Sequence, residues 1–457
     1  MLTTATLPLI LAMFSSLALM CDFDLNTSSS TRLAEIMYEW VQVEFYWPSE
    51  EMRRQFEANG SYNPAHNLIS GIKTYKGQVY VTVPRLKYTT GVPSTLNKVV
   101  VRDDEPLLTP FPNWQSQKLG DCTALQCAMS MEVDPITGYM YVIDPGRSGI
   151  FGNVSGQPEP VICPPKLVVY DLKDGRMIRS HNFPEDLVSN QTNFLNDIVL
   201  DRGSANSTTA KWVYITDAVD PKLIVFNLDN NRTHVIYHSS MDFEPGDGSN
   251  ITVNGISYIL RTPIDGLAMS SDFEYVYYCA LGSKNLYQVP TSVVRGNTSD
   301  FGSHVRLVGA KTSQTGGMTY GTDNLYYGAL TRNSVFRWEV TKDAQAKGGN
   351  FGLVEINSET EIARDDEMMQ WPDSFTVDEE GYLWFTACRA HLFLLSDIDF
   401  SGRQGSNYRI WRVNITENGY LAPRAGSGET SSGANSWRAA PINVIPLFVL
   451  AWRQWRN

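Results

Sequence analysis

One short segment recurs along the chain and constrains its fold more than any other feature. Each copy is a run of aromatic and β-branched residues, a composition that favours a β-strand. Aligned on one aromatic residue, the copies are centred at Tyr80, Tyr141, Tyr214, Tyr277, Tyr326 and Trp384. Because they follow one another about 60 residues apart over most of the chain, the sequence predicts a closed or stacked array of similar β units.

Further strands are expected on both sides of each copy. Most copies have an upstream partner such as NDIVLD at Asn196, joined to it by a turn that contains Gly, and a downstream strand such as KLIVFNL at Lys222. Each unit therefore holds at least three strands, with length left for a fourth. The predicted fold is all-β, a six-bladed β-propeller over residues 35–422 with long inter-strand loops. Two packed β-sandwiches are the alternative, but they predict no regular repeat.

Closure of such a ring needs strands from both ends of the chain to share a blade, because an open ring leaves an unpaired edge. The segment Met37 to Tyr46, MYEWVQVEFY, is the expected N-terminal contributor.

The two ends of the chain differ from this array. Leu7 to Met20 is an apolar run of the length found in secretory signals, so residues 1–20 are predicted to be a signal peptide; a buried N-terminal helix is the alternative. Residues 423–457 are of low complexity and are expected to form a disordered tail. Their apolar stretch, Pro441 to Trp452, is too short to span a bilayer, and the charged end of the chain counts against a GPI anchor.

Sequons and cysteines support a secreted, extracellular glycoprotein. Six cysteines fit an oxidising compartment. Glycosylation acceptors must lie on exposed segments, and loops between strands are the expected positions. Nine N-x-S/T sequons are present, at Asn26, Asn59, Asn153, Asn190, Asn206, Asn231, Asn250, Asn297 and Asn414.

Charge and missing motifs exclude several functional classes. The chain has 37 Lys and Arg against 49 Asp and Glu, a net charge of −12, which argues against nucleic-acid binding and suits small cationic ligands. With six His and no paired CxxC motifs, a zinc site is not expected. The absence of a G-x-S-x-G elbow, a P-loop and a GxGxxG motif after a strand leaves hydrolase, NTPase and dinucleotide-binding roles unsupported, and no cofactor is predicted.

The candidate site lies where the innermost strands begin, because these strands line the central channel of a propeller. Asp373 and Phe375 are predicted to share one side of their strand by simple alternation, so that one small aromatic amine could contact both. The structural alternative is that Asp373 caps its own turn and Phe375 packs between blades. The predicted ligand-binding residues are Asn67, Asn196, Asp197, Asp265, Asp373 and Phe375. Gly266, Gly316, Gly317 and Ser374 also lie where the inner strands begin.

Three kinds of function fit these residues at the entrance of the channel. An amine or catechol can sit between a carboxylate and aromatic rings. The acids can instead hold calcium, although no spacing is diagnostic. Finally, Asp197, Asp265 or Asp373, with His66 or His181, can move a proton in a tautomerisation, so the catalytic residues stay unassigned.

Several longer motifs follow one another along the chain: YEWVQVEF at Tyr38, NPAHNLISGI at Asn63, GDCTALQC at Gly120, GYMYVIDPGR at Gly138, CPPKLVVYDL at Cys163 and WPDSFTVDEEGYLWF at Trp371. Together they resemble the yellow and major royal jelly protein family over roughly residues 35–420. The resemblance implies a secreted six-bladed propeller, a Cys122–Cys163 pair and a Cys279–Cys388 pair. Many relatives carry a further cysteine where this chain has Pro135 to Thr137, so the partners of Cys21 and Cys127 stay open.

Members of that family differ in function, so the resemblance leaves alternatives open. Some members act in melanin formation, some convert dopachrome, some bind biogenic amines and some are nutritive. The sequence favours a channel that binds a small amine or catechol, in pigmentation or cuticle. A dopachrome isomerase is the alternative enzyme, and a structural or nutritive glycoprotein without a ligand is the third class.

Overall fold

The computed structural model describes residues 34–150, 161–296, 300–396 and 398–423. The predicted signal peptide over residues 1–20 lies outside the described residues, and so does the predicted tail, apart from residue 423. No helix within the described ranges is long and apolar enough to cross a membrane.

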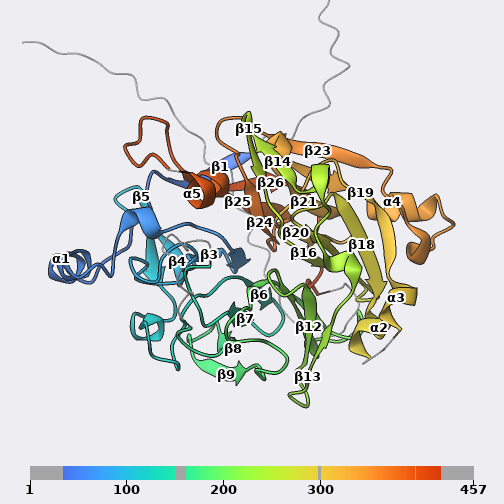
Figure 1. Cartoon of the computed structure of the whole chain (residues 1–457), viewed down its shortest axis with the longest axis horizontal. Coiled ribbons are helices and arrows are strands. Elements are labelled where there is room, and N and C mark those ends of the chain that lie inside the picture. The colour runs from blue at the N-terminus through green and yellow to red at the C-terminus, as the bar shows by residue number, and fades with distance from the viewer. Residues whose placement is uncertain (1–33, 151–160, 297–299, 397, 424–457) are drawn as a thin grey trace, which may run out of the picture.

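Six four-stranded antiparallel sheets form a ring, and the six-bladed propeller predicted from the repeat is confirmed (Figure 1). The first three blades are β2 (Ile72–Tyr75), β3 (Gln78–Thr82), β4 (Leu96–Arg102) and β5 (Glu105–Pro110); β6 (Met131–Asp134), β7 (Tyr139–Asp144), β8 (Lys166–Asp171) and β9 (Met177–Asn182); and β10 (Leu195–Asp201), β11 (Trp212–Asp217), β12 (Lys222–Asn227) and β13 (Thr233–Ile236). The last three are β16 (Ile264–Met269), β17 (Tyr275–Ala280), β18 (Asn285–Pro290) and β19 (Arg306–Ala310); β20 (Met318–Tyr320), β21 (Leu325–Ala329), β22 (Ser334–Trp338) and β23 (Glu359–Arg364); and β24 (Pro372–Val377), β25 (Tyr382–Ala387), β26 (Tyr408–Asn414) and β1 (Glu35–Trp40).

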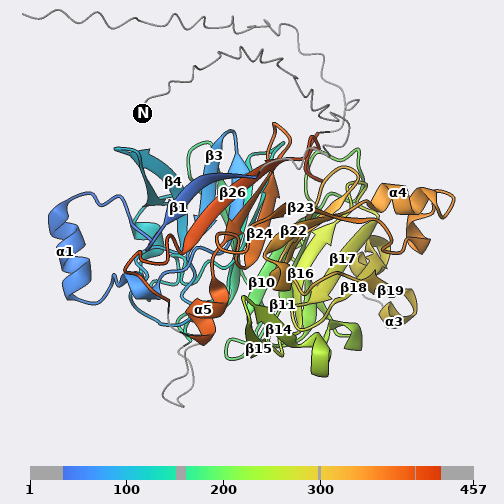
Figure 2. The same cartoon turned by 90° about the horizontal axis from the view of Figure 1, so that it is seen from above.

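The remaining elements lie in the loops between these strands. A two-stranded hairpin, β14 (Asn250–Val253) and β15 (Ile256–Ile259), precedes blade 4. The α-helices are α1 (Glu50–Ala58), α2 (Thr291–Arg295), α3 (Phe301–His304), α4 (Val340–Gln345) and α5 (Ala390–Leu395). Helix α5 and the β14–β15 hairpin lie on the same face of the ring (Figure 2).

The ring is closed by strands from both ends of the propeller. Strand β1 pairs antiparallel with β26, with Glu35 opposite Arg412 and Trp40 opposite Tyr408. The N-terminal segment was predicted to supply this strand from Met37 to Tyr46, and the structure places it slightly earlier, at Glu35–Trp40. The innermost strands also form an unbroken circle, since each contacts the innermost strands of both neighbouring blades.

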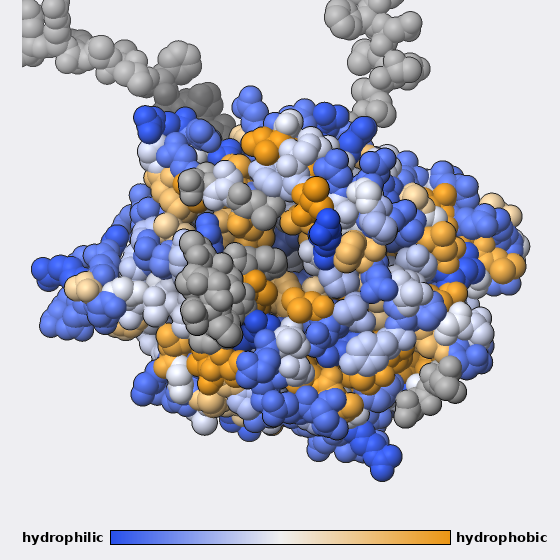
Figure 3. All heavy atoms as spheres, viewed as in Figure 1, coloured by the Kyte–Doolittle hydropathy of each residue, from blue (hydrophilic) through white to orange (hydrophobic). Residues whose placement is uncertain are grey.

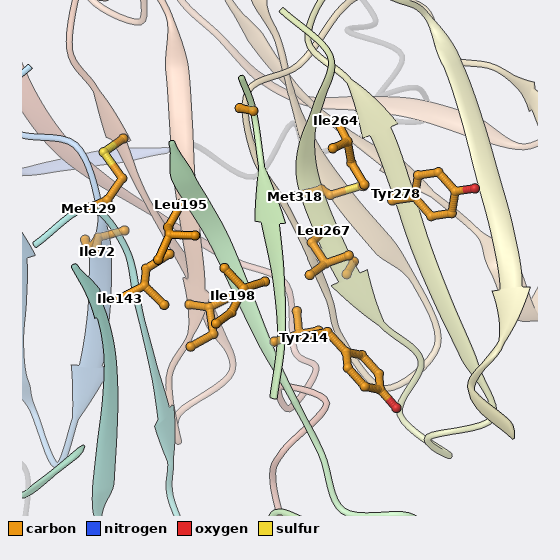
Figure 4. Packing of buried hydrophobic residues seen from close by; sticks show 14 of the residues in the cluster. Ile72, Met129, Ile143, Leu195, Ile198, Tyr214, Ile264, Leu267, Tyr278 and Met318 are labelled. Carbon is orange, nitrogen blue, oxygen red and sulfur yellow. The ribbon is translucent and has the colours of Figure 1, made fainter. Parts of the chain in front are cut away.

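The aromatic residue that defines the repeat lies on the second strand of every blade. Tyr80, Tyr141, Tyr214, Tyr277, Tyr326 and Trp384 occupy β3, β7, β11, β17, β21 and β25, and all six are buried. Aliphatic side chains of the inner strands fill the space between neighbouring blades, as Figure 4 shows for Ile72, Leu195, Ile198 and Leu267. Burial of this apolar surface is the main stabilising term for such an array.

The cysteines follow the expected pairing only in part. Cys122 and Cys163 form a disulfide with a Cα–Cα distance of 5.4 Å. The expected Cys279–Cys388 pair is wrong in this structure, where both residues are buried free thiols. Cys279 lies on β17 of blade 4 and Cys388 follows β25 of blade 6, so blade 5 stands between their strands. Cys127 is likewise a buried thiol, and Cys21 lies outside the described residues.

The sequons lie at the surface but not all in loops. Asn59, Asn206 and Asn231 are exposed outside the strands, and Asn190 is half-buried in a loop. Asn250 is the first residue of β14 and Asn414 is the last residue of β26, so these two depart from the expected placement in loops. Asn26, Asn153 and Asn297 lie outside the described residues.

Candidate functional site

Three inner strands carry the same irregularity where they enter the channel. In β10 the pairing runs from Leu195↔Asp217 to Ile198↔Ile215, so three steps on β10 match two on β11. The same extra residue occurs in β16, between Ile264 and Leu267, and in β24, between Pro372 and Phe375. Such β-bulges change the direction of side chains locally. The bulged residues are the predicted site pairs Asn196–Asp197, Asp265–Gly266 and Asp373–Ser374.

A threonine on the second strand holds two of these bulges. Thr216 Oγ1 accepts a hydrogen bond from the Asp197 N–H at 3.0 Å and donates to the Asp265 carbonyl at 2.8 Å. Thr386 does the same between the Ser374 N–H at 3.2 Å and the Ser70 carbonyl at 3.0 Å. Each threonine therefore joins the bulge of its own blade to the next blade, at Asp265 within β16 and at Ser70 just before β2.

The bulges surround a narrow cavity of about 100 Å³ on the channel axis. Its mouth lies on the face that carries α5, where Figure 3 shows a hollow edged by hydrophobic residues. Of the predicted site residues, the structure brings Asn196, Asp197, Asp265, Asp373 and Phe375 to this cavity. Leu260 after the hairpin and Ala390 and Leu394 of α5 form part of its apolar wall.

Asp265 and Asp373 face the same space from β16 and β24. Asp265 is buried and accepts a hydrogen bond from Asn196 Nδ2, while Asp373 Oδ1 accepts one from Trp371 Nε1 at 3.2 Å. Burial, and the charges of Asp373 and Asp197, raise the pKa of Asp265 well above its usual value. Burial raises the pKa of Asp373 to about 6. Among the described residues, no cationic side chain forms an ion pair with either carboxylate.

Asp197 has a more structural setting than these two acids. Its Oδ1 accepts a hydrogen bond from the Ile198 N–H at 2.8 Å, and its Oδ2 accepts one from the Leu267 N–H of blade 4 at 2.9 Å. Burial raises its pKa to about 7, and the charge of Lys73 opposes that shift. Asp197 thus links two blades and adds negative charge to the cavity.

Glycines let the acid of blade 6 approach the neighbouring blade. A Cβ atom on Gly316 would overlap Asp373 Oδ1, and one on Gly317 would overlap the Asp373 carbonyl oxygen. The Gly316–Gly317 pair therefore stands where other blades carry Asn or Asp, because blade 5 makes room for the Asp373 bulge.

Asn67 and Phe375 both make structural contacts, and of these two only Phe375 also borders the cavity. Asn67 does not line the cavity: its buried Nδ2 donates to the carbonyls of Asn63 at 2.7 Å and Gly91 at 2.9 Å. The ring of Phe375 stacks on Phe385 at 5.8 Å, within a cluster that includes Tyr326 of blade 5. The β24 bulge breaks the alternation on which a shared side for Asp373 and Phe375 depended.

The two histidine candidates lie away from the cavity. His66 stacks on Tyr88 with ring centroids 3.7 Å apart, and His181 on β9 packs against Phe226. Neither is among the residues that line the channel, so neither can move a proton there.

The cavity residues that sequence reasoning missed include four with polar side-chain atoms: Lys73, Glu132, Trp371 and Tyr420. Lys73 Nζ and Glu132 Oε2 form an ion pair at 3.1 Å between β2 and β6, and Tyr420 Oη donates to Glu132 at 3.2 Å. Only Trp371 had a signal in the sequence, because it directly precedes Pro372 and Asp373. The other three come from distant segments that only the ring brings together.

The donor set does not favour a metal. Within the described ranges, no group of three or more His, Cys, Asp or Glu side chains is arranged to hold a metal ion. The calcium alternative therefore gains no support from the channel.

Fold and site together define a six-bladed β-propeller whose axial channel holds a cluster of carboxylates near its mouth. Residues 126–419 match the model of the family described as "Major royal jelly protein". The chain belongs to this family, as its motifs indicated.

The curated relatives agree with this assignment. Major royal jelly protein 1 of Apis mellifera is 25% identical over 416 residues, covering 86% of this chain and 90% of the relative. Protein yellow of Drosophila melanogaster is 28% identical over 392 residues, covering 83% of this chain and 68% of the relative. A luciferin-regenerating enzyme is a similar solved structure, with a TM-score of 0.44, 12% identity and coverage of 79% of this chain and 94% of that chain.

Proposed function

We propose that this protein binds a small primary amine with an aromatic or catechol group in its propeller channel. The supporting observation is the pair Asp265 and Asp373, which face one cavity without a cationic partner among the described residues. Buried carboxylates are costly unless they are protonated or paired. A ligand ammonium supplies the missing charge and forms charge-assisted hydrogen bonds with both.

The walls of the cavity support a ligand with an apolar body. Phe194, Tyr320 and Trp371 provide aromatic surface, and several leucines provide aliphatic surface, among them Leu260 and Leu394. Small-molecule sites typically combine such walls with a few convergent polar groups. An amine that carries an aromatic ring matches both parts of this cavity.

We further propose that the chain is exported and acts outside the cell in pigmentation or cuticle formation. The N-terminal apolar run, the exposed sequons and the Cys122–Cys163 disulfide support export. The similarity to Protein yellow supports the biological context.

A second candidate function is the isomerisation of dopachrome. Asp373, with a pKa of about 6, and Asp197, with a pKa of about 7, are suited to accept and return a proton near neutral pH. One carboxylate would take a proton from a ring carbon of the substrate while a neighbouring carboxylic acid gives one to its oxygen. If the protein neither binds an amine or catechol nor turns over dopachrome, the third class remains, a structural or nutritive glycoprotein.

Calorimetry with a panel of amines and catechols, beside a dopachrome turnover assay, tests the proposal. Saturable binding without turnover supports the binder, and turnover supports the isomerase. In Asp373→Asn the shape is kept and the charge removed, so amine binding should weaken by about 1–3 kcal/mol, the scale of a charged hydrogen bond. Asp229→Asn, at an exposed turn, is the matched control and should bind as the unmodified protein does. Unchanged amine affinity in folded Asp373→Asn would contradict the assignment.

A further inference from the structure

Three rings lie in contact at the mouth of the channel. The rings of Trp371 and His391 lie nearly parallel, with centroids 5.9 Å apart and an interplanar angle of 16°. The ring of Tyr258, on β15, meets His391 edge-on at 5.9 Å. His391 belongs to α5, so the three rings connect the β14–β15 hairpin, α5 and the segment before β24 on one face of the propeller (Figure 2).

The backbone at Trp371 is held in an unusual conformation. Its φ is +57°, in the left-handed region that bulky residues rarely adopt. Arg389, whose N–H donates to the Gln370 carbonyl at 3.3 Å, also has a left-handed φ of +45°. Strained residues of this kind persist where the surrounding structure fixes them, and they cluster at binding sites. At Trp371 this conformation accompanies an indole that lines the channel. At Arg389 it directly precedes α5.

The indole is tied directly to the acid cluster. Trp371 is 3% exposed and lines the cavity, and its Nε1 donates to Asp373 Oδ1 at 3.2 Å. His391 supports the indole on one side and is itself 1% exposed. Burial and the charge of Arg389 lower the pKa of His391 to about 4, so this ring is neutral near pH 7. By contrast, the ring of Phe375 is engaged with Phe385 between blades 5 and 6.

We propose that Trp371 is the specificity-determining residue of the channel, whose indole contacts the ring of an aromatic amine while the ammonium lies at Asp265 and Asp373. The site therefore selects aromatic amines over saturated amines of similar shape. An indole beside a carboxylate attracts both an ammonium, through its π face, and a second aromatic ring, through offset or edge-on packing. This inference rests on the proposed amine binding and names the side chain that contacts the ligand's ring.

Binding of 2-phenylethylamine and 2-cyclohexylethylamine, measured by calorimetry at pH 7.5, tests this assignment. The two probes share the amine and the linker and differ in the aromatic character of the ring. The unmodified protein should prefer the aromatic probe by about 3- to 10-fold, the range expected for a ring–ring contact. Trp371→Leu should bring the ratio of the two affinities close to one. Trp371→Phe should keep most of the ratio but bind both probes more weakly, because Asp373 loses its N–H donor.

Phe385→Leu is the control for the loss of an aromatic ring near the site. Its ratio of the two affinities should stay that of the unmodified protein, because Phe385 stacks on Phe375 and Trp411 and does not line the cavity. A ratio that survives in Trp371→Leu would overturn the inference, and so would a ratio that disappears equally in Phe385→Leu. If Trp371→Leu does not fold, as judged by its thermal melt, Trp371→Met fills more of the indole volume and should also lose the ratio.

The two proposals fail in different ways. If the unmodified protein binds neither probe, amine binding itself is wrong and the role of Trp371 falls with it. If both probes bind and Asp373→Asn weakens both, but Trp371→Leu leaves the ratio unchanged, amine binding stands and only the specificity assignment is refuted.

Discussion

Asp265 and Asp373 line one cavity, and neither forms an ion pair with a cationic side chain among the described residues. The shift of their pKa values comes first from burial and, for Asp265, also from the neighbouring carboxylates. Perturbed acids in a cavity are typical of functional sites, although ion-pair networks perturb acids too. The Lys73–Glu132 pair deeper in the channel is such a network, and its charges already balance each other.

These raised pKa values make the stability of the ligand-free protein depend on pH. In the unfolded chain an Asp has a pKa near 3.9, so the folded protein holds protons that the unfolded chain has lost. The contribution of each such acid is present below about pH 4 and is lost as the pH rises through its folded pKa, about 6 for Asp373 and about 7 for Asp197. Alkaline pH therefore disfavours the empty channel.

Asp265→Asn should remove part of this penalty. The amide keeps an oxygen that can accept from Asn196 Nδ2 but cannot become charged. The variant should gain stability over the unmodified protein at pH 8, by on the order of 1–2 kcal/mol, and show a smaller gain at pH 5. Urea unfolding at both pH values measures this difference. An equal effect at pH 5 and pH 8 would show that the Asp265 charge does not matter.

At the scale of elements, the bulged inner strands place these acids. Two residues occupy the space of one in β10, β16 and β24, which directs Asn196, Asp265 and Asp373 toward the axis. Thr216 and Thr386 fasten two bulges to the next blade, and Cys279 occupies the equivalent position of the repeat in blade 4. In blade 5 that position is Gly328, where a Cβ would overlap the Pro372 carbonyl.

Gly317→Ala tests how tightly blades 5 and 6 meet at the site. Its Cβ would overlap the backbone carbonyl of Asp373, which cannot move aside as a side-chain tip can. We expect a loss of about 1–3 kcal/mol of stability, the usual range for overpacking, together with weaker amine binding. The control is Gly419→Ala, whose Cβ would make ordinary contacts at 3.5 Å with Val377. Equal melting of both variants would contradict the close approach.

The whole molecule depends on one closure between its ends. The backbone ladder of β1 and β26 completes blade 6 and thereby fixes β24, the strand that carries Asp373. A ring whose last blade lacks its outer strand exposes an unpaired edge on β26. The site is therefore coupled to a contact at the far edge of the same sheet.

Removal of residues 34–40 should lower the thermal midpoint and cause aggregation, because it deletes this strand. Glu35→Gln is the control: it removes the exposed ion pair with Arg412 at 2.9 Å but keeps the ladder. Such surface pairs contribute about 0–1 kcal/mol, so this variant should melt nearly as the unmodified protein does. Differential scanning calorimetry compares the two. A shortened chain with an unchanged midpoint would show that closure by β1 is dispensable.

The sequence alone determined the number of blades and much of their make-up. A repeated aromatic strand with partners on both sides is a local signal, and all six copies occupy the second strand of a blade. It also marked Asn196, Asp197, Asp265 and Asp373 as channel residues, because inner strands begin there in every blade. Both signals depend only on neighbours in the chain and on the symmetry of a ring.

Only the tertiary structure decided how these residues are used. A bulge depends on the register with the adjacent strand, so simple alternation could not show that the Phe375 ring stacks on Phe385. Asn67 looked equivalent to the other polar residues, yet its loop turns it toward the carbonyls of Asn63 and Gly91. Trp371 became part of the site through a left-handed backbone and a contact with α5. Such features arise from the register between strands and from packing between segments far apart in the chain, which no local pattern encodes.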